Sequence, residues 1–243
     1  MAIRVTVWNE NLHERIHQYV RDVYPETMHG CIRDFLATDE ELIVRTTTFD
    51  SEESGLPDSL LNDTDVLLWW GHGQHELVPD ELVDKIYRRV VQEGMGFIAL
   101  HSAHMSKPFR RLTGMPCTLT WGREQKAVVW NVLPTHPIMQ GVPLHFELFE
   151  EIYGEPFAIP VPDELLFITW YEEGNVFRGG ATWHRGLGKV VYLHPGHESV
   201  PSFRNEHVQR IIRNAVHWAA NTNRHESVRF HDVHQTAPIV SQD

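Results

Sequence analysis

The sequence has little cysteine, no long hydrophobic run and no cluster of basic residues. Its two cysteines, Cys31 and Cys117, fit neither a disulfide framework nor a CxxC metal motif, which is typical of a reducing compartment. The longest apolar runs, such as "DVLLWWG" and "GKVVYL", are too short to cross a bilayer, and the N-terminus lacks a basic region followed by an apolar stretch. We therefore expect a cytoplasmic protein with no membrane partner.

The balance of charges is acidic. The formal net charge is -12, from 21 basic and 33 acidic residues. Nucleic-acid binding depends on basic side chains that neutralise phosphates. The composition therefore argues against a nucleic-acid partner and favours a small neutral or polar substrate.

Histidine is the residue type present in excess, with 17 copies beside eight tryptophans. A histidine can simply lie on the surface, and position along the chain must separate the ordinary copies from the functional ones. We expect surface positions for five of the copies, His13, His17, His225, His231 and His234.

Strand and helix patterns alternate along the chain. Short runs rich in β-branched and apolar residues predict strands at 3–8, 41–49, 65–71, 96–100 and 188–193. Amphipathic periodicity predicts helices at 26–37, 79–93 and 204–221, the second with Pro79 at its start and Gly94 as its stop. Residues 65–100 form a strand, helix, strand unit, which predicts a doubly wound α/β fold of flavodoxin-like type, with a mostly parallel sheet and helices on both faces.

The chain reads as a single domain over residues 1–243. No linker rich in proline, glycine and serine divides it. Residues of about 115–165 are richer in turns and short strands, and we expect them to form an insertion at one end of the sheet. Residues of about 223–243 form a polar tail.

Histidines follow three of the predicted strands. "GHGQHE" carries His72 and His75, "HSAH" carries His101 and His104, and "HPGHE" carries His194, His197 and Glu198. In an open parallel sheet the ligand site lies at the carboxyl ends of the strands. The sequence therefore predicts a histidine-rich site at this edge, suited to acid-base chemistry or to a divalent metal.

Two of these segments resemble the class I glutamine amidotransferase fold. In that fold a buried strand ends in a turn with a nucleophilic cysteine, and a later strand ends in a His-Pro-x-Glu motif. Here "IALHSAH" and "YLHPGHE" stand at those places, but His101 occupies the cysteine position. Amidotransferase chemistry, which needs the thiolate, is therefore not expected. Ser102 follows without the glycines of a G-x-S-x-G elbow, so we do not expect a serine nucleophile.

A closer resemblance is to the ThuA-like family of trehalose-utilisation proteins, which shares the amidotransferase-like fold. Four segments between about 65 and 220 carry it: "GMGFIALHSA", "HPIMQGVPLHFELFEEIYG", "ATWHRGLGKVVYLHPGHE" and "NAVHWAA". The resemblance implies a role in carbohydrate metabolism, with trehalose, related disaccharides or their 3-keto forms as substrates. It implies that His197 is the family's usual histidine, whereas His194 and the His72 and His75 pair are additions in this sequence.

The first hypothesis for the mechanism is a metal-dependent enzyme, a hydrolase or isomerase. Its predicted ligands are His72, His101, His194, His197 and Glu150, and its predicted catalytic residues are His101, His197 and Glu198, with Glu151 as another candidate ligand or base. Histidine ligands suit zinc best, and manganese, iron or nickel would also fit. Predicted substrate-binding residues are Trp70, Gly73, Ser102, His104, Trp121, Trp183 and Arg185, in which the indoles would pack against sugar rings.

Two alternatives remain open at this stage. In one, His101 and His197 act without a metal as an acid-base pair in a sugar isomerase or epimerase. In the other, the protein is a sugar-binding or regulatory module without catalytic activity. A homo-oligomer is expected only from the frequency of oligomers among proteins in general.

Overall fold

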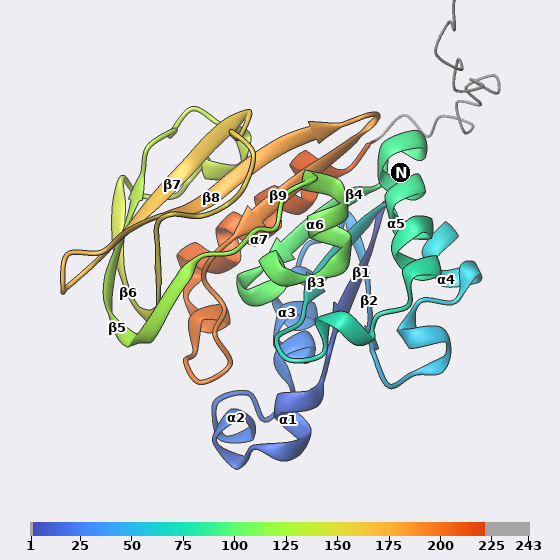
Figure 1. The fold of residues 1–243 in the computed structure, drawn as a ribbon, viewed down its shortest axis with the longest axis horizontal. Coiled ribbons are helices and arrows are strands. Elements are labelled where there is room, and N and C mark those ends of the chain that lie inside the picture. Colours follow the sequence, from blue (N-terminus) through green and yellow to red (C-terminus); the bar gives the residue numbers. More distant parts are fainter. Residues whose placement is uncertain (1, 222–243) are drawn as a thin grey trace, which may run out of the picture.

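The computed structural model describes residues 2–221 and contains one nine-stranded sheet (Figure 1). The predicted tail lies outside the described residues. The strand order is β2-β1-β3-β4-β9-β8-β7-β5-β6. The strands are β1 Ile3–Asn9, β2 Leu42–Thr48, β3 Val66–Trp70, β4 Gly96–Leu100, β5 Thr120–Asn131, β6 His145–Gly154, β7 Glu164–Tyr171, β8 Val176–Arg185 and β9 Gly188–Leu193.

The sheet has a parallel part and an antiparallel part. Strands β2, β1, β3, β4 and β9 are parallel, whereas β8, β7, β5 and β6 pair antiparallel. The predicted doubly wound α/β fold is confirmed for the parallel part. Region 115–165, expected as an insertion, contributes β5 and β6, which continue the same sheet at its far edge. In Figure 1 these antiparallel strands extend to the left of the parallel part.

Helices cover both faces of the parallel part. The α-helices are α1 Leu12–Ile16, α2 Gln18–Val23, α3 Met28–Leu36, α4 Asp58–Asn62, α5 Asp80–Glu93, α6 Lys107–Thr113 and α7 Glu206–Ala219, and short 3-10 turns are η1 Glu52–Gly55, η2 His75–Leu77, η3 His101–Met105, η4 Pro137–Met139 and η5 Ser202–Arg204. Apolar side chains of α3 and α7 pack on one face, and those of α4, α5 and α6 pack on the other. No helix among residues 2–221 is long and apolar enough to cross a membrane.

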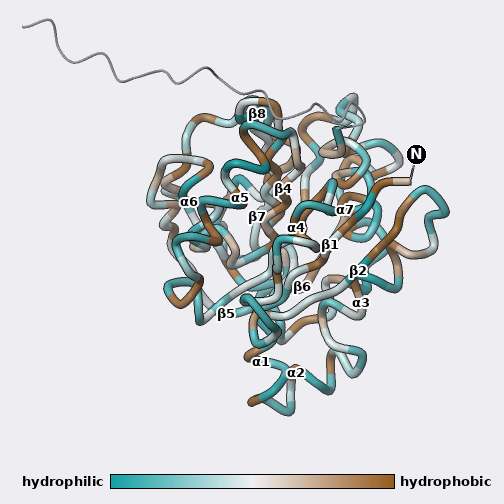
Figure 2. Tube along the Cα trace, turned by 90° about the vertical axis from the view of Figure 1, so that its right-hand side faces the viewer, coloured by the Kyte–Doolittle hydropathy of each residue, from teal (hydrophilic) through white to brown (hydrophobic). Residues whose placement is uncertain are grey.

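The central strands are apolar on both sides because both faces are covered. Every residue of β3 and of β4 is buried, and Figure 2 shows apolar colouring along β4 inside the molecule. Helix α5 begins after Pro79 with two acids in its first turn and ends at Gly94, whose left-handed φ of 82° suits glycine. The sequence pattern predicted both ends of this helix.

Candidate functional site

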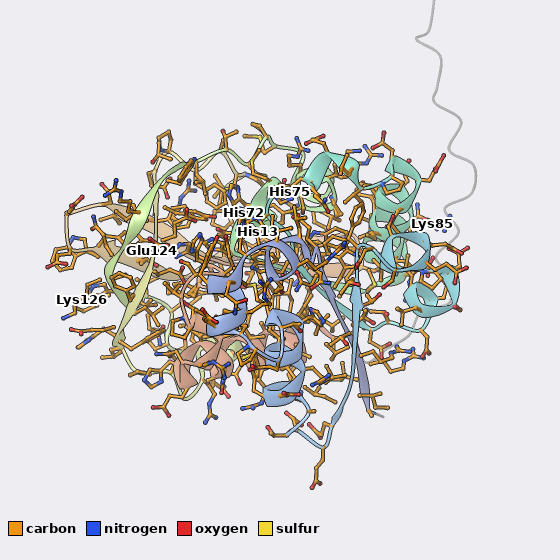
Figure 3. All side chains as sticks on the ribbon, turned by 90° about the horizontal axis from the view of Figure 1, so that it is seen from below. His13, His72, His75, Lys85, Glu124 and Lys126 are labelled. Carbon is orange, nitrogen blue, oxygen red and sulfur yellow. The ribbon has the colours of Figure 1, made fainter. Side chains whose placement is uncertain are left out.

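The carboxyl ends of β1, β3, β4 and β9 meet at one edge of the sheet, and the predicted histidines follow three of them. Figure 3 shows His13, His72 and His75 gathered on the side seen from below, with Glu124 of β5 near them. His101, directly after β4, has a φ of 51°, a left-handed conformation that is uncommon outside glycine. The sharp turn lets the chain leave the strand and directs the imidazole into the molecule.

His101 is fully buried and held at both ring nitrogens. Its Nδ1 lies 2.9 Å from the backbone carbonyl of His194, so Nδ1–H donates this hydrogen bond and the neutral ring carries its lone pair on Nε2. Nε2 lies 3.0 Å from Oε2 of Glu151 and 3.2 Å from the hydroxyl of Tyr153. Although Oε2 is close, its geometry satisfies no hydrogen bond with any described residue. Two electron-rich atoms therefore face each other, an arrangement that a proton or a metal ion would stabilise.

The pKa of His101 reflects these contacts. Burial alone would lower the pKa, but the contact with Glu151 and the charges of Glu150 and Glu151 raise it above the ordinary value of histidine. The environment of His101 therefore favours a positive charge at Nε2.

His197 is oriented in the same way as His101. Its Nδ1 lies 2.7 Å from Oγ of Ser199, and that hydroxyl donates to Oε1 of Glu124. The backbone N–H of Ser199 also points at Nδ1, but at 3.4 Å, so the shorter contact decides: because the hydroxyl hydrogen is used, Nδ1–H donates to Oγ of Ser199 and the lone pair lies on Nε2. Nε2 lies 3.9 Å from Oε1 of Glu151. His101, Glu151 and His197, here called the inner triad, offer ligand atoms that all lie within 4.8 Å of one another.

A second group of the same composition lies beside the first. His13, His72 and Glu198, here called the outer triad, also offer ligand atoms within 4.8 Å of one another. Nδ1 of His13 lies 2.7 Å from Oε1 of Glu198. Burial would raise the pKa of Glu198, but the hydrogen bond from His13 and the nearby imidazoles of His72 and His197 hold it well below its usual range. Glu198 is therefore an ionised carboxylate in the interior.

Glu150 organises the loop that carries His197. Its carboxylate is fully buried and accepts four hydrogen bonds, from the backbone N–H groups of Glu151, Gly196 and His197 and from the hydroxyl of Ser202. These bonds occupy both oxygens. Glu150, expected as a metal ligand, thus points into the backbone of this loop, and its neighbour Glu151 points into the site.

Glu10 organises the loop that carries His72. Directly after β1, its buried carboxylate accepts hydrogen bonds of 2.8 to 3.0 Å from the backbone N–H groups of His72, Gly73 and Gln74. A Cβ on Gly73 would lie 3.5 Å from Oε1 of Glu10, so the loop follows the carboxylate closely. Gly73, expected to contact substrate, thus contacts Glu10 in the structure.

A cavity of about 550 Å³ opens above the inner triad. Glu151 and His197 of this triad line it, together with Tyr153, and Trp121 stands at its wall with 75% of its surface exposed. The volume lies within the range of pockets for small molecules. His72, His75, Ser102 and His104 also line this cavity, so the structure brings most of the predicted rim residues to one place.

Several predicted site residues lie elsewhere. Trp70 is buried under the site and donates through Nε1 to the carbonyl of Gly196. Trp183 is buried and donates to the carbonyl of Val161. Arg185 pairs with Gly188 at the start of β9, the end of that strand opposite to His194, and its Nε donates to a backbone carbonyl. None of the three lines the cavity.

His194 is also separate from both triads. It is fully buried, and its Nε2 lies 3.1 Å from the hydroxyl of Tyr171 and 3.2 Å from the carbonyl of Glu151. Burial and the neighbouring imidazole of His101 lower its pKa well below the ordinary value. Its backbone carbonyl accepts from His101 and its ring contacts the backbone carbonyl of Glu151, so His194 supports the inner triad without being one of its ligand residues.

Four residues of the site carry no clear signal in the sequence. His13, expected on the surface, lies in the short helix α1 and bonds Glu198, so that expectation is wrong. Glu10 follows the strand β1, and an acid directly after a strand could have suggested it. Glu124 and Tyr153 come from the antiparallel strands β5 and β6, whose path could not be read from the pattern. Of the other copies expected on the surface, His17 stacks on Tyr19, and positions 225, 231 and 234 lie outside the described residues.

The buried His104 predicts a loss of stability in acid. Burial lowers its pKa to about 3, from 6.5. Below about pH 6.5 the imidazole of residue 104 therefore binds a proton in the unfolded chain but stays neutral in the folded chain. The folding stability present above that pH is lost as the pH falls. At pH 5 this difference amounts to about 2 kcal/mol. Asparagine can keep the hydrogen bond that Nδ1 of His104 makes with the carbonyl of Cys117.

We expect urea unfolding of the His104→Asn variant to show about 2 kcal/mol less loss of stability between pH 7.5 and pH 5 than the native chain. Parallel pH curves for the two proteins would contradict this assignment.

A known protein family matches most of the chain. The family model described as trehalose utilisation, ThuA, matches residues 4–219, most of the 243-residue chain. The chain belongs to the ThuA family. No curated protein matches the sequence. This match confirms the resemblance to the ThuA-like family that four short segments of the sequence indicated.

Solved structures agree with this assignment. A ThuA-like protein from Parabacteroides merdae is 14% identical, with a TM-score of 0.70 over 94% of this chain and 93% of the other. One from Bacteroides uniformis is 17% identical, with a TM-score of 0.63 over 89% and 90%. A glutamine amidotransferase from Thermotoga maritima is 11% identical, with a TM-score of 0.53 over 90% and 98%. At such identities the similarities show the fold alone, and they confirm the amidotransferase-like fold.

Proposed function

We propose that this ThuA protein is a metal-dependent enzyme of carbohydrate utilisation, with a divalent cation held by His101, Glu151 and His197. The observation that carries the proposal is the convergence of ligand atoms from two imidazoles and one carboxylate, of which His197 and Glu151 line the cavity and His101 lies buried behind them. Each imidazole is held through Nδ1–H, as is usual for metal-binding histidines. Two histidines and one glutamate form a known catalytic zinc set, which leaves a position for water or substrate.

The proposed reaction is hydrolysis or isomerisation of a disaccharide or keto-sugar. A bound divalent cation would polarise a sugar carbonyl or acidify a water molecule. The hydroxyl of Tyr153, beside Nε2 of His101, is placed to exchange a proton with a substrate in the cavity. The description of the family as trehalose utilisation supports a sugar as substrate. A similar structure is named as a cytoplasmic protein from Salmonella typhimurium, which supports a cytoplasmic location here.

The test is the metal content of untagged protein purified without an immobilised-metal column. Elemental analysis should find at least one zinc, manganese, iron or nickel ion per chain, and about one ion fewer in both His101→Ala and His197→Ala. The exposed His145 of β6 supplies the matched control, because His145→Ala should keep the native content. A native protein that is free of metal and cannot be loaded would overturn the proposal.

A second candidate rests on the same 3.0 Å contact between Nε2 of His101 and Oε2 of Glu151. If a proton instead of a metal lies there, His101 and Glu151 form a buried acid-base pair suited to sugar isomerisation. A metal-free protein that turns over a keto-sugar would favour this candidate. Binding of a sugar without turnover would favour a module with no catalytic activity.

Trp121 is the proposed platform for a sugar ring. Because its indole is exposed at the cavity wall, truncation should cost little folding stability. We expect Trp121→Ala to weaken binding of trehalose or a keto-disaccharide about 10-fold, equivalent to about 1.4 kcal/mol. Calorimetric titration checks this. Trp130, on the same strand and 42% exposed but away from the cavity, is the control, and equal effects of both substitutions would exclude a platform role.

A further inference from the structure

We propose that a second divalent cation binds at the outer triad, His13, His72 and Glu198. The ligand atoms of these residues lie within 4.8 Å of one another, and the set is again two histidines and one glutamate. The residues come from three separate places, helix α1, the loop after β3 and the loop after β9. This inference goes beyond the proposed function, which needs only the inner triad.

The carboxylate of Glu198 is the first observation that points to a cation. Glu198 is 98% buried, since only 2% of its surface is exposed. Oε1 accepts a hydrogen bond from His13, whereas Oε2 is buried and accepts none from the described residues. A buried carboxylate oxygen without a hydrogen bond is costly, and a metal ion is a partner that would satisfy it.

His72 supplies the second observation. Neither of its ring nitrogens has a hydrogen bond among residues 2–221, although its ring is well fixed. The ring stacks on Trp70 with an interplanar angle of 12° and meets His13 edge-on with ring centroids 4.6 Å apart. Glu10 fixes the backbone below it through the N–H of His72. A histidine held in place with free ring nitrogens beside a carboxylate is pre-organised as a ligand.

The two triads meet at consecutive residues of one loop. His197 belongs to the inner triad and Glu198 to the outer triad, and Nε2 of His197 lies 3.5 Å from Oε2 of Glu198. The ring centroids of His72 and His197 are 6.1 Å apart. Two adjacent cations at such a junction would form a dinuclear centre, a type of site that positions both the attacking and the leaving oxygen of a hydrolysis reaction.

The experiment is a titration of the chelator-treated, untagged full-length chain with cobalt(II) chloride. Bound cobalt is measured by visible absorption and by elemental analysis after desalting. Because the tail carries further histidines, the count is judged by the ions lost in each variant. We expect His13→Gln and His72→Gln each to lose one ion, Glu151→Gln to lose a different one, and His72→Gln with Glu151→Gln to lose two. His17→Gln, in the loop after α1 and outside both triads, should lose none.

The outcomes separate this proposal from the proposed function. Loss of one ion in Glu151→Gln and none in His13→Gln or His72→Gln would overturn the second site and leave the inner one standing. If each single variant loses one ion and the double variant loses no more than one, the two triads share a single ion. This result would also overturn the second site. Loss in the outer variants alone would support the outer site and overturn the inner one.

Discussion

Replacement of Glu150 by glutamine is expected to lower the free energy of unfolding by about 3 kcal/mol and to abolish metal binding at the inner triad. The carboxylate accepts four buried hydrogen bonds, two at each oxygen. A glutamine amide replaces one oxygen by an N–H₂ group, so in either orientation at least one buried backbone N–H would face a donor, and the remaining bonds would lose their ionised acceptor. Each unsatisfied buried donor costs about 1 to 3 kcal/mol. The loop that carries His197 would shift as these bonds are lost.

Urea unfolding and elemental analysis measure the two effects of Glu150→Gln. Glu147 lies on the same strand and pairs with Lys126 at 3.0 Å, with both side chains mostly exposed. Glu147→Gln is therefore the matched control, expected to change stability by less than about 0.5 kcal/mol and to keep the native metal content. A Glu150→Gln variant as stable as this control would show that the buried carboxylate does not hold the loop.

The parallel half of the fold could be predicted from the sequence because its physical signals are local. Strands β3 and β4 are buried on both faces, so they appear as continuous apolar runs, and the helix between them has its start and stop residues in the sequence. The carboxyl ends of parallel strands share one edge. For this reason, the placement of His72, His101 and His197 near one another followed from topology alone.

The antiparallel half was harder to predict. Strand β6 alternates between exposed and buried residues only up to Phe149, and from Glu150 onward every residue is buried. Two consecutive glutamates in a region buried on both faces give no indication of which one faces the site. The structure shows that Glu151 does, whereas Glu150 binds the backbone of the neighbouring loop.

His13 could not be assigned for a different reason. It lies just after β1, in a helix of five residues whose sequence carries no amphipathic pattern long enough to read. Its partner Glu198 is 185 residues away in the chain. Only the assembled sheet brings the ends of β1 and β9 to the same edge.

Glu151→Gln is expected to leave the fold intact and to abolish the stabilisation that a bound ion provides. Oε2 of Glu151 accepts no hydrogen bond from the described residues, so at a pH at which His101 is neutral, loss of the carboxylate charge leaves no buried donor without a partner. An ion at 100 times its dissociation constant stabilises a protein by about 2.7 kcal/mol. In a chain of this length that corresponds to a rise in Tm of about 5 to 10 °C.

Thermal unfolding with and without zinc or manganese measures this effect in proteins that all carry His72→Gln, so that only the inner triad contributes. We expect the rise in Tm in this background and in the Glu147→Gln control, but not after Glu151→Gln, whose metal-free Tm should match its parent. A full rise in Tm with Glu151→Gln would mean that the ion binds elsewhere. Residues 150 and 151 are adjacent on β6. If Glu150→Gln lowers the stability of the metal-free protein and Glu151→Gln does not, the first carboxylate holds the loop and the second binds the ion.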